Sequence, residues 1–299
     1  MKVLILSGSG FLGQAIVSEF EKIIPEMSIV NTTSRSCGVQ KGIRYVDFES
    51  QRAFNQILEE TNPNFIIHLA SSCLGKQSER EFRKGVRRDK NLINALKDWG
   101  GVVKIVFVAS MSCFKATEQD INVECQSPES FYGKEKAEMV KSLKQLSGSS
   151  KLIDTKIVYP TSIYGAGQRN KMFLPCLLEN IKNNTKMRAK GSKKRRDYVH
   201  VSDVSRAIVA IINDFERFRD TDIFLNSGQL VGLGELAVMV CDLLGRNIDD
   251  VIVFEDSADD ENDYQLIGDS YNFELIHSVS VPLSDGLREM FSEVGRKEY

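Results

Sequence analysis

The residues in this sequence best suited to chemistry are a tyrosine and a lysine four positions apart, Tyr132 and Lys136. Residues at this spacing lie on one face of an α-helix, and we predict a helix from Ser130 to about Leu146. A phenol with an ordinary pKa of about 10 is a poor base at neutral pH. A neighbouring ammonium group favours the phenolate, so the pair predicts a general acid–base centre. The alternative is two solvated helix residues without a chemical role.

A second feature is a glycine-rich loop of the form G-x-G-x-x-G. It comprises Gly8, Ser9, Gly10, Phe11, Leu12 and Gly13. It follows the apolar residues Val3–Leu6 directly and opens a predicted helix from Phe11 to about Lys22. Here the first glycine permits a tight turn, the second lets the backbone approach a pyrophosphate, and the third allows close packing of helix on sheet. Because the helix N-terminus also attracts phosphates, the loop predicts a dinucleotide cofactor.

The end of the next predicted strand bears on the choice between NAD and NADP. A carboxylate at this point usually binds the ribose hydroxyls of NAD. This sequence has no acidic residue between Asn31 and Arg35, and it offers Ser34 and Arg35 instead. Since an arginine suits a 2′-phosphate, the sequence favours NADP(H), with NAD(H) as the alternative. Asp47 stands where a carboxylate can meet the adenine amino group.

Short apolar segments alternate with longer amphipathic ones around these residues. The strands we predict are Val3–Leu6, Ser28–Val30, Phe65–Leu69, Val102–Ala109 and Ile153–Tyr159. A further helix is predicted over Glu79–Trp99. Apolar strands that alternate with helices are typical of a parallel sheet covered on both faces, so we predict an α/β fold with a doubly wound Rossmann sheet.

The alternation loosens after Pro160, which predicts a smaller C-terminal α/β substrate lobe. We place the Rossmann domain at residues 1–163, with 197–224 added to it, and the lobe at 164–299. The elements predicted in this part are a strand at Asp197–Val201, a solvated acidic loop at Glu255–Glu261, and helices at Phe173–Lys182, Ser202–Asn213 (capped by Ser202) and Leu233–Leu244.

Composition narrows the function classes. The chain has 299 residues and a net charge of −2, so no strong field draws it to nucleic acid or to an anionic membrane. Its six cysteines form no C-x-x-C pair and it has three histidines, so we expect no metal site and a reduced, cytoplasmic chain. The N-terminal apolar run is too short for a signal segment or a membrane span.

Several motifs occur in one order along the chain. They are the glycine-rich loop, His68-Leu69-Ala70, a strand ending at Ala109-Ser110, Tyr132-x-x-x-Lys136, Tyr164-Gly165, and Arg196-Asp197-Tyr198-Val199-His200-Val201-Ser202-Asp203. This set resembles the extended short-chain dehydrogenase/reductase family, in its nucleotide-sugar epimerase, dehydratase and reductase branch. The resemblance covers residues 1 to about 245. It implies a nucleotide-sugar substrate and a homodimer formed through two Rossmann-domain helices.

The resemblance also implies roles for single residues. Ser110 donates a hydrogen bond to the substrate oxygen on which Tyr132 acts, and Ser112 is the competitor for this role. Lys136 holds the nicotinamide ribose as well as tuning Tyr132. The cofactor contacts are completed by the loop residues together with Ser34, Arg35, Asp47, Phe48, Leu69, Ala70, Tyr159 and Ser162.

Substrate contacts are implied for Arg196 and Ser162. Arg196 occupies the position that contacts the diphosphate of the nucleotide sugar, and a guanidinium fork suits a diphosphate. Ser162 stands at a position often held by a substrate-binding asparagine. The neighbouring run Lys193–Arg195 is interpreted as a solvated turn, since no basic stripe continues it toward a nucleic-acid surface.

The sequence departs from the family pattern at several positions. Ser7 replaces the first glycine of the family's loop, Tyr159 replaces a common arginine, and Gly85 stands where an asparagine is usual. Sugar 4,6-dehydratases of this branch carry Asp-Glu where this chain has Met111 and Ser112. Because loss of water needs an acid and a base, the sequence argues against a 4,6-dehydratase.

The resulting hypothesis is NADPH-dependent reduction of a 4-keto (6-deoxy) sugar nucleotide. An NAD-dependent nucleotide-sugar 4-epimerase is a close alternative. A non-catalytic Rossmann protein that senses a cofactor or acts as a scaffold is a further one, but such a protein would be expected to have lost Tyr132 or Lys136.

Overall fold

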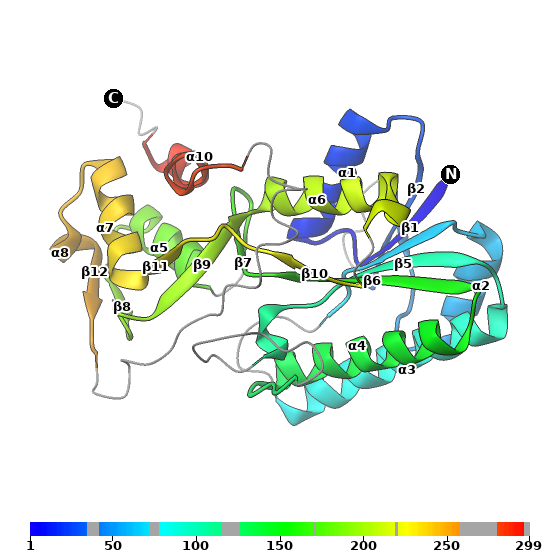
Figure 1. Cartoon of the computed structure of the whole chain (residues 1–299). Helices are drawn as coiled ribbons and strands as arrows, with labels where there is room; N and C mark the ends of the chain where they lie inside the picture. The colour runs from blue at the N-terminus through cyan, green and yellow to red at the C-terminus, as the bar shows by residue number, and fades with distance from the viewer. Residues whose placement is uncertain are drawn as a thin grey trace. The chain divides into compact units, whose positions relative to one another are not determined.

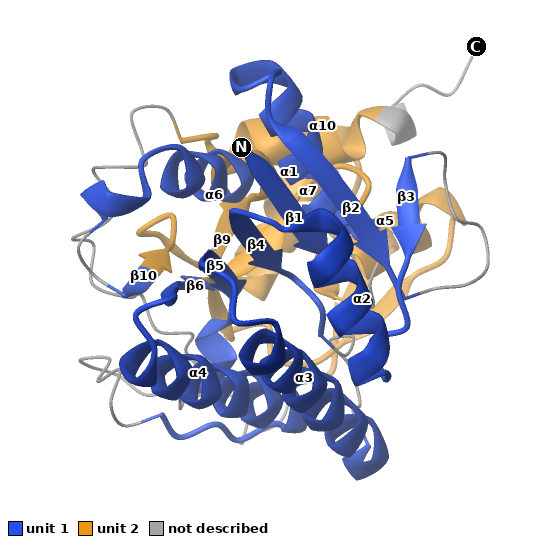
Figure 2. Ribbon diagram, turned by 90° about the vertical axis from the view of Figure 1, so that its right-hand side faces the viewer, with its two compact units in different colours: residues 1–115, 122–159, 204–223 blue, residues 116–121, 160–203, 224–299 orange. Residues whose placement is uncertain are grey.

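The computed structural model describes residues 1–34, 42–71, 78–114, 126–169, 172–218, 221–256 and 280–295. The chain forms two compact units, which Figure 2 distinguishes by colour. The first comprises residues 1–115, 122–159 and 204–223, and the second comprises residues 116–121, 160–203 and 224–299.

A seven-stranded sheet runs through the first unit, in the order β10-β6-β5-β4-β1-β2-β3 (Figure 1). Its strands are β1 (Lys2–Leu6), β2 (Ser28–Thr33), β3 (Ile43–Tyr45), β4 (Phe65–His68), β5 (Val103–Val108), β6 (Ile153–Pro160) and β10 (Asp222–Leu225). The pairs from β3 to β6 are all parallel. Strand β4 is buried at every residue, as expected for a strand covered on both faces.

Helices cover both faces of this sheet. They are α1 (Phe11–Ile23), α2 (Gln51–Thr61), α3 (Glu79–Trp99), α4 (Phe131–Ser149) and α6 (Val201–Asn213), with the 3₁₀ turns η1 (Met111–Cys113) and η2 (Phe215–Arg217). Figures 1 and 2 both show α3 and α4 side by side on one face, and α1 and α6 on the other. The predicted doubly wound Rossmann sheet is therefore confirmed.

Serine caps fix where the long helices of the first unit begin. Ser78 and Glu81 form a capping box at the start of α3, which ends at Gly100 in a left-handed conformation with φ of 64°. The hydroxyl of Ser130 accepts a hydrogen bond from the Gly133 N–H at 3.0 Å and so sets the first turn of α4. This cap places Tyr132 in that first turn.

Two predicted elements differ in their bounds for identifiable reasons. Strand β2 ends at Thr33, three residues later than predicted. A hydrogen bond stabilises its polar end, because the buried Thr32 hydroxyl donates to the Ile5 carbonyl at 2.8 Å. Helix α6 begins at Val201, so Ser202 is inside the helix and does not cap it. Its hydroxyl lies 2.8 Å from Nδ1 of His200 instead.

The second unit contains two small sheets and the remaining helices. The strands β7 (Ser162–Tyr164), β9 (Arg195–His200) and β11 (Leu230–Gly232) form one sheet in the order β11-β9-β7, and β8 (Met187–Ala189) pairs with β12 (Ile252–Phe254). The helices are α5 (Phe173–Lys182), α7 (Leu233–Leu244), α8 (Ile248–Val251) and α10 (Leu283–Gly295). At the predicted acidic loop, Glu255 and Asp256 are exposed and residues 257–261 lie outside the described part of the chain.

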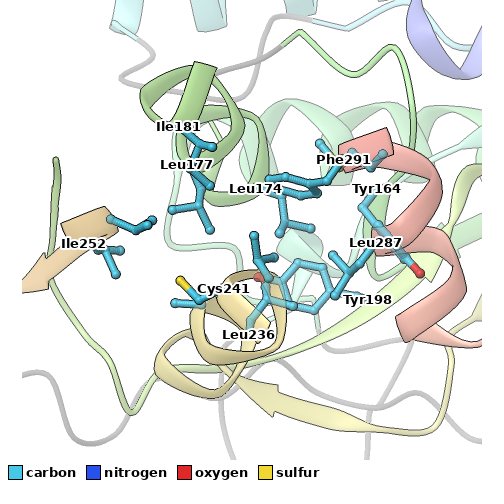
Figure 3. Close-up of a cluster of buried hydrophobic side chains, with 14 residues drawn as sticks. Tyr164, Leu174, Leu177, Ile181, Tyr198, Leu236, Cys241, Ile252, Leu287 and Phe291 are labelled. Carbon is cyan, nitrogen blue, oxygen red and sulfur yellow. The ribbon is translucent and has the colours of Figure 1, made fainter. Parts of the chain in front are cut away.

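The core of the second unit is a cluster of buried apolar side chains from α5, α7, α10 and the neighbouring strands (Figure 3). Leu177, Leu236 and Leu287, one from each of these helices, have no exposed surface. Gly286 lets α10 come close to β7, since a Cβ at this position would lie 2.3 Å from the Tyr164 hydroxyl oxygen.

No helix within the described ranges is long and apolar enough to span a membrane.

Candidate functional site

The glycine-rich loop lies between the end of β1 and the start of α1, as predicted from its sequence. A Cβ on Gly13 would lie 2.4 Å from the Cα of Gly8, so Gly13 allows α1 to pack against the loop. A Cβ on Gly8 would lie 1.9 Å from Oδ1 of Asn31 on β2. Gly10 caps α1 with no side-chain hydrogen bond, and the first turn of α1 has no acidic residue. The N-terminus of α1 thus suits an anionic group.

Ser7 makes the turn that was attributed to Gly8 in the sequence. Its φ is +69°, in the left-handed region where glycine is favoured, whereas Gly8 is not among the residues with positive φ. Gly8 is required by its close approach to Asn31. The departure from the family pattern at Ser7 is therefore accommodated with backbone strain.

Several of the predicted cofactor contacts lie at the carboxyl ends of parallel strands. Ser34 follows β2 and is exposed, Asp47 and Phe48 follow β3, and Leu69 and Ala70 follow β4. Ligands of open α/β sheets bind at this edge. The Phe48 ring is buried and stacks on Phe54 with 5.5 Å between ring centroids, which gives it a packing role. Arg35 lies outside the described residues.

The predicted catalytic residues come together at the ends of β5 and α4. Ser110 follows β5 and caps η1, where its Oγ accepts a hydrogen bond from the Ser112 N–H at 3.1 Å. Tyr132 is partly buried, and Ser110 and Ser71 lie close enough to its phenol to lower its pKa. Of the two serines considered from the sequence, Ser110 is thus the one that affects the pKa of the phenol, and its own hydroxyl donates to Oγ of Ser112 at 3.2 Å. Ser71, two residues beyond Leu69, was not singled out from the sequence.

Gly133 is the residue that allows this approach. A Cβ there would lie 2.0 Å from the Ser112 carbonyl oxygen, so a larger residue would push α4 away from η1. Sequence analysis gave Gly133 no role, because nothing in the local pattern indicates a contact with a segment twenty residues away.

The Lys136 ammonium is buried behind Tyr132. Its Nζ donates to the Val108 carbonyl at 2.7 Å and lies 5.9 Å from the centroid of the Tyr132 ring. Burial lowers the pKa of Lys136 to about 8. Burial also raises the pKa of Tyr132 to about 12, although the Ser71 and Ser110 side chains oppose this. The phenol is therefore protonated at neutral pH, whereas the prediction is that Lys136 and the positive nicotinamide ring together lower its pKa.

Tyr159 was predicted to contact the cofactor, but its side chain lies in the core. It has no exposed surface, and its hydroxyl donates to Asp222 at 2.8 Å and accepts from Gln126 at 3.1 Å. Burial, followed by the Asp222 carboxylate, raises the pKa of this phenol well above its ordinary value. Any contact of Tyr159 with a cofactor would therefore involve its main chain.

The second unit has a pocket that brings two predicted substrate contacts together, Ser162 and Arg196. Its volume is about 180 Å³. The other lining residues are Ile163, Tyr164, Gln168, Met172, Phe173, Leu174, Pro175, Tyr198 and Leu233. The pocket thus combines apolar walls with one guanidinium, as a site for a ligand with a flat apolar part and an anionic part requires.

Asp197 fixes the strand that carries Arg196. This carboxylate is fully buried and accepts hydrogen bonds from the Thr161 hydroxyl at 2.7 Å and from the Ser227 N–H at 2.8 Å. The Gln229 N–H donates to its other oxygen at 3.1 Å. Asp197 is therefore a structural anchor, and the side chain of its neighbour Arg196 lines the pocket.

Comparison with known proteins places the chain in a family. A sequence model of the NAD dependent epimerase/dehydratase family matches residues 3–225, and the chain belongs to this family. A curated relative from Escherichia coli, dTDP-4-dehydro-6-deoxyglucose reductase, is 27% identical over 263 residues, which is 78% of this chain and 79% of the relative.

Solved structures share the fold at low sequence identity. The UDP-glucose 4-epimerase of Brucella ovis in complex with NAD superimposes with a TM-score of 0.84 at 18% identity, over 98% of both chains. DesIV of Streptomyces venezuelae, a dTDP-glucose 4,6-dehydratase with NAD and TYD bound, gives a TM-score of 0.82 at 18% identity, over 98% of this chain and 96% of that one. Among the described residues, no group of three or more His, Cys, Asp or Glu side chains is placed to hold a metal ion.

Proposed function

We propose that the protein is an NAD(P)-dependent oxidoreductase that acts on a nucleotide-activated sugar. We further propose that it uses NADPH to reduce a 4-keto (6-deoxy) sugar nucleotide. The observation that carries the proposal is the convergence of Ser110 and Tyr132, with Lys136 buried beside them, at the carboxyl edge of a Rossmann sheet. This is the position where such sheets bind their ligands.

The residues present fit a dinucleotide cofactor. Gly8, Gly10 and Gly13 bring the backbone of the loop to the uncapped N-terminus of α1, which is suited to a pyrophosphate. When bound there, the cofactor supplies the hydride. Ser34, and Arg35 beyond the described residues, support a preference for the 2′-phosphate of NADPH, because no carboxylate follows β2 in this segment.

The acid–base chemistry of the site favours the direction of reduction. A carbonyl oxygen that receives a hydride at its carbon must also receive a proton, and Tyr132 holds one at neutral pH because its pKa is about 12. Ser110 polarises the same oxygen by a hydrogen bond. As the proton leaves, a protonated Lys136 stabilises the phenolate that remains.

The similarity of this chain to a known reductase supports the proposal. The Escherichia coli relative is a reductase that matches most of the chain. Met111 and Ser112, which follow Ser110, carry no carboxylate for the loss of water. This counts against a 4,6-dehydratase, even though DesIV shares the fold.

A 4-epimerase is the second candidate. A UDP-glucose 4-epimerase of Mycoplasma pneumoniae is 23% identical over 38% of this chain, and the structure from Brucella ovis is an epimerase with NAD. An epimerase keeps its cofactor through the turnover, whereas a reductase exchanges it. The intact Ser110, Tyr132 and Lys136 oppose a role as a non-catalytic sensor or scaffold.

The test is to denature the freshly purified protein, identify any nucleotide it releases, and titrate the cofactor-free protein with NADPH and NADH. Little released nucleotide and tighter binding of NADPH support the reductase, which is then assayed with a 4-keto-6-deoxy nucleotide sugar. Stoichiometric NAD in the released fraction would instead identify an epimerase. Cofactor binding without turnover of any keto-sugar or nucleotide sugar would favour the sensor.

A further inference from the structure

Charged side chains are buried where α3 and α4 pack against each other in the first unit. Nη2 of Arg88 on α3 lies 2.8 Å from Oε1 of Glu135 on α4, and Nε of Arg88 lies 2.8 Å from Oδ1 of Asp89. Glu135 has no exposed surface, and Asp89 is 6% exposed. Nε2 of the buried His68, at the end of β4, is 3.3 Å from the Asp89 carboxylate. We refer to Arg88, Asp89 and Glu135 as the buried charge cluster.

Space for Glu135 depends on a glycine in the middle of α3. A Cβ on Gly85 would lie 2.3 Å from the carboxyl carbon and from Oε2 of Glu135. Gly85 lies one helical turn before Arg88 and Asp89, inside a 21-residue helix. A glycine at such a position costs about 1 kcal/mol relative to alanine, so the helix gives up stability to admit a carboxylate.

Stability alone does not account for this arrangement. Taking two charges out of water costs free energy that their attraction rarely exceeds, and well-packed apolar residues often stabilise a protein as much or more. A buried pair that also needs a helix-weakening glycine points to a role in the chemistry of its neighbours. Its nearest neighbour in sequence is Lys136, directly after Glu135.

The buried charge cluster is balanced by the ammonium of Lys136. Arg88 and a protonated Lys136 carry two positive charges, and Asp89 and Glu135 carry two negative ones. Burial lowers the pKa of Lys136 first, the charge of Arg88 lowers it further, and the carboxylates of Asp89 and Glu135 raise it. Arg88 thus lowers the pKa of Lys136, and Glu135 raises it.

The other groups around Lys136 are uncharged near neutral pH. Burial lowers the pKa of His68 on β4, so this imidazole is neutral. Burial raises the pKa of Cys113 on η1 to about 12, and the pKa of Tyr132 on α4 is also about 12. The ring of Phe107 on β5 lies 4.7 Å from Nζ of Lys136, and its centroid lies 5.1 Å from that of His68, which contacts Asp89, so Lys136 is beside the buried charge cluster. The charges that can alter Lys136 therefore come from the buried charge cluster.

We propose that Arg88 and Glu135 are positioning residues of the acid–base centre. Glu135 is held in the space left by Gly85, and its ion pair with Arg88 joins α4 to α3. Together the two residues set the charge of the Lys136 ammonium. Through that charge they govern how readily Tyr132 gives up its proton. The step from Lys136 to turnover rests on the proposed function, but the effect on Lys136 itself does not.

The test is an NMR titration of the full-length protein labelled with ¹³C at lysine Cε, in which the Lys136 signal is assigned by its loss in Lys136→Met. In the unsubstituted protein the midpoint is expected at about 8. Glu135→Gln keeps the shape but removes a negative charge, and should lower the midpoint by about one pH unit. Arg88→Met removes a positive charge, and should raise it by about one pH unit.

Opposite shifts of the Lys136 midpoint distinguish this role from a structural one, since loss of packing alone would shift the midpoint in the same direction in both variants. Arg88→Lys keeps the charge and should restore the midpoint. If Arg88→Met does not fold, a lower midpoint in Glu135→Gln with an unchanged midpoint in Arg88→Lys supports the proposal, and an unchanged midpoint in Glu135→Gln overturns it. Arg87→Met and Glu138→Gln, which make the same changes at exposed neighbours on the same helices, should leave the midpoint within about 0.2 units.

The pH profile of kcat then connects Lys136 to the reaction. Its basic limb should shift with the Lys136 midpoint, downward in Glu135→Gln and upward in Arg88→Met. Unmoved midpoints in both variants, or shifts of the same sign, would overturn the proposal whatever the activity. Opposite midpoint shifts in a protein that turns over no nucleotide sugar would overturn the proposed function and leave the positioning role in place.

Discussion

At the scale of single residues, the first unit assembles its acid–base group by burial as much as by hydrogen bonding. The same removal from water raises the pKa of Tyr132 and lowers that of Lys136, so the phenol holds its proton more tightly than the ammonium does. Such a pair holds a proton ready to donate at neutral pH and has a nearby group able to stabilise the charge that donation creates. The residue pattern alone indicated the pair but not the balance between them.

We predict that Tyr132→Phe lowers kcat by about 10²- to 10⁴-fold, because the phenylalanine keeps the ring but has no proton to donate. Cofactor affinity should stay nearly the same, since the change removes one oxygen. Steady-state rates and NADPH titrations on the same preparation measure both. A variant that retained more than a tenth of the activity would show that another group supplies the proton.

Ser7 provides a prediction about stability. Its φ of +69° costs an L-residue roughly 1–2 kcal/mol, and glycine avoids this cost while losing more entropy on folding. Ser7→Gly should therefore raise the free energy of unfolding by about 0.5–1 kcal/mol. Urea denaturation measures the change.

Ser142→Gly is the control for Ser7→Gly, because it places glycine within α4 and should lower the free energy of unfolding by about 0.5 kcal/mol. A Ser7 variant that lost stability as this control does would show that the turn is not strained.

At the scale of elements, local signals were sufficient for three of the helices but missed α2, which Ser50 caps. The predicted bounds of α3, α5 and α7 match the structure, and α3 has both a capping box and a C-terminal glycine. Strand β2 was predicted too short, because its polar end is held by a hydrogen bond between Thr32 and Ile5 on another strand. No local pattern encodes that bond.

The same limit applied to the site. Tyr132 and Lys136 were predicted from their spacing, and Ser110 was predicted from the resemblance to the family. The contacts that bring them together were not, because the glycine at position 133 and the pair of Arg88 with Glu135 act between elements distant in sequence. A glycine in a helix indicates a close approach, but the partner becomes identifiable only in the fold.

Gly133→Ala tests the close approach of α4 to η1. The new Cβ would meet the Ser112 carbonyl at 2.0 Å, so we expect α4 to shift, kcat to fall at least tenfold, and the free energy of unfolding to fall by about 1–3 kcal/mol. Activity assays and urea denaturation measure the two effects.

Gly148→Ala is the matched control, since it lies in the same helix with no atom within 4 Å of its Cβ. Because alanine favours the helix, this control should gain up to about 1 kcal/mol and keep its activity. Equal behaviour of the two variants would mean that Gly133 has no steric role.

At the scale of the whole molecule, the two compact units have different chemical content. The first holds the glycine-rich loop, the acid–base residues and the buried charge cluster, all around one parallel sheet. The second holds a pocket with apolar walls and the guanidinium of Arg196, on a strand anchored by Asp197. We infer a division of labour, in which the first unit binds the cofactor and performs the chemistry, and the second selects the substrate.

This division predicts how a substitution in the second unit changes the kinetics. Arg196→Ala removes the guanidinium proposed to bind a diphosphate, and a lost charge-assisted hydrogen bond of about 1.5–3 kcal/mol should raise KM for the nucleotide sugar by roughly 10- to 100-fold. The affinity for NADPH, measured by fluorescence titration, should not change, because the cofactor site belongs to the first unit. The effect should also shrink for a sugar substrate that lacks the diphosphate, since that substrate has no anion to lose.

Arg195→Ala is the control for this experiment. Arg195 is the preceding residue on β9 and carries the same charge, but its guanidinium is exposed and donates to the Leu230 carbonyl at 2.9 Å. Its loss should leave KM within about twofold, since exposed charges contribute little. If both variants raised KM equally, the effect would come from the general positive charge of this strand. If Arg196→Ala weakened NADPH binding as much as substrate binding, the division of labour between the units would be wrong.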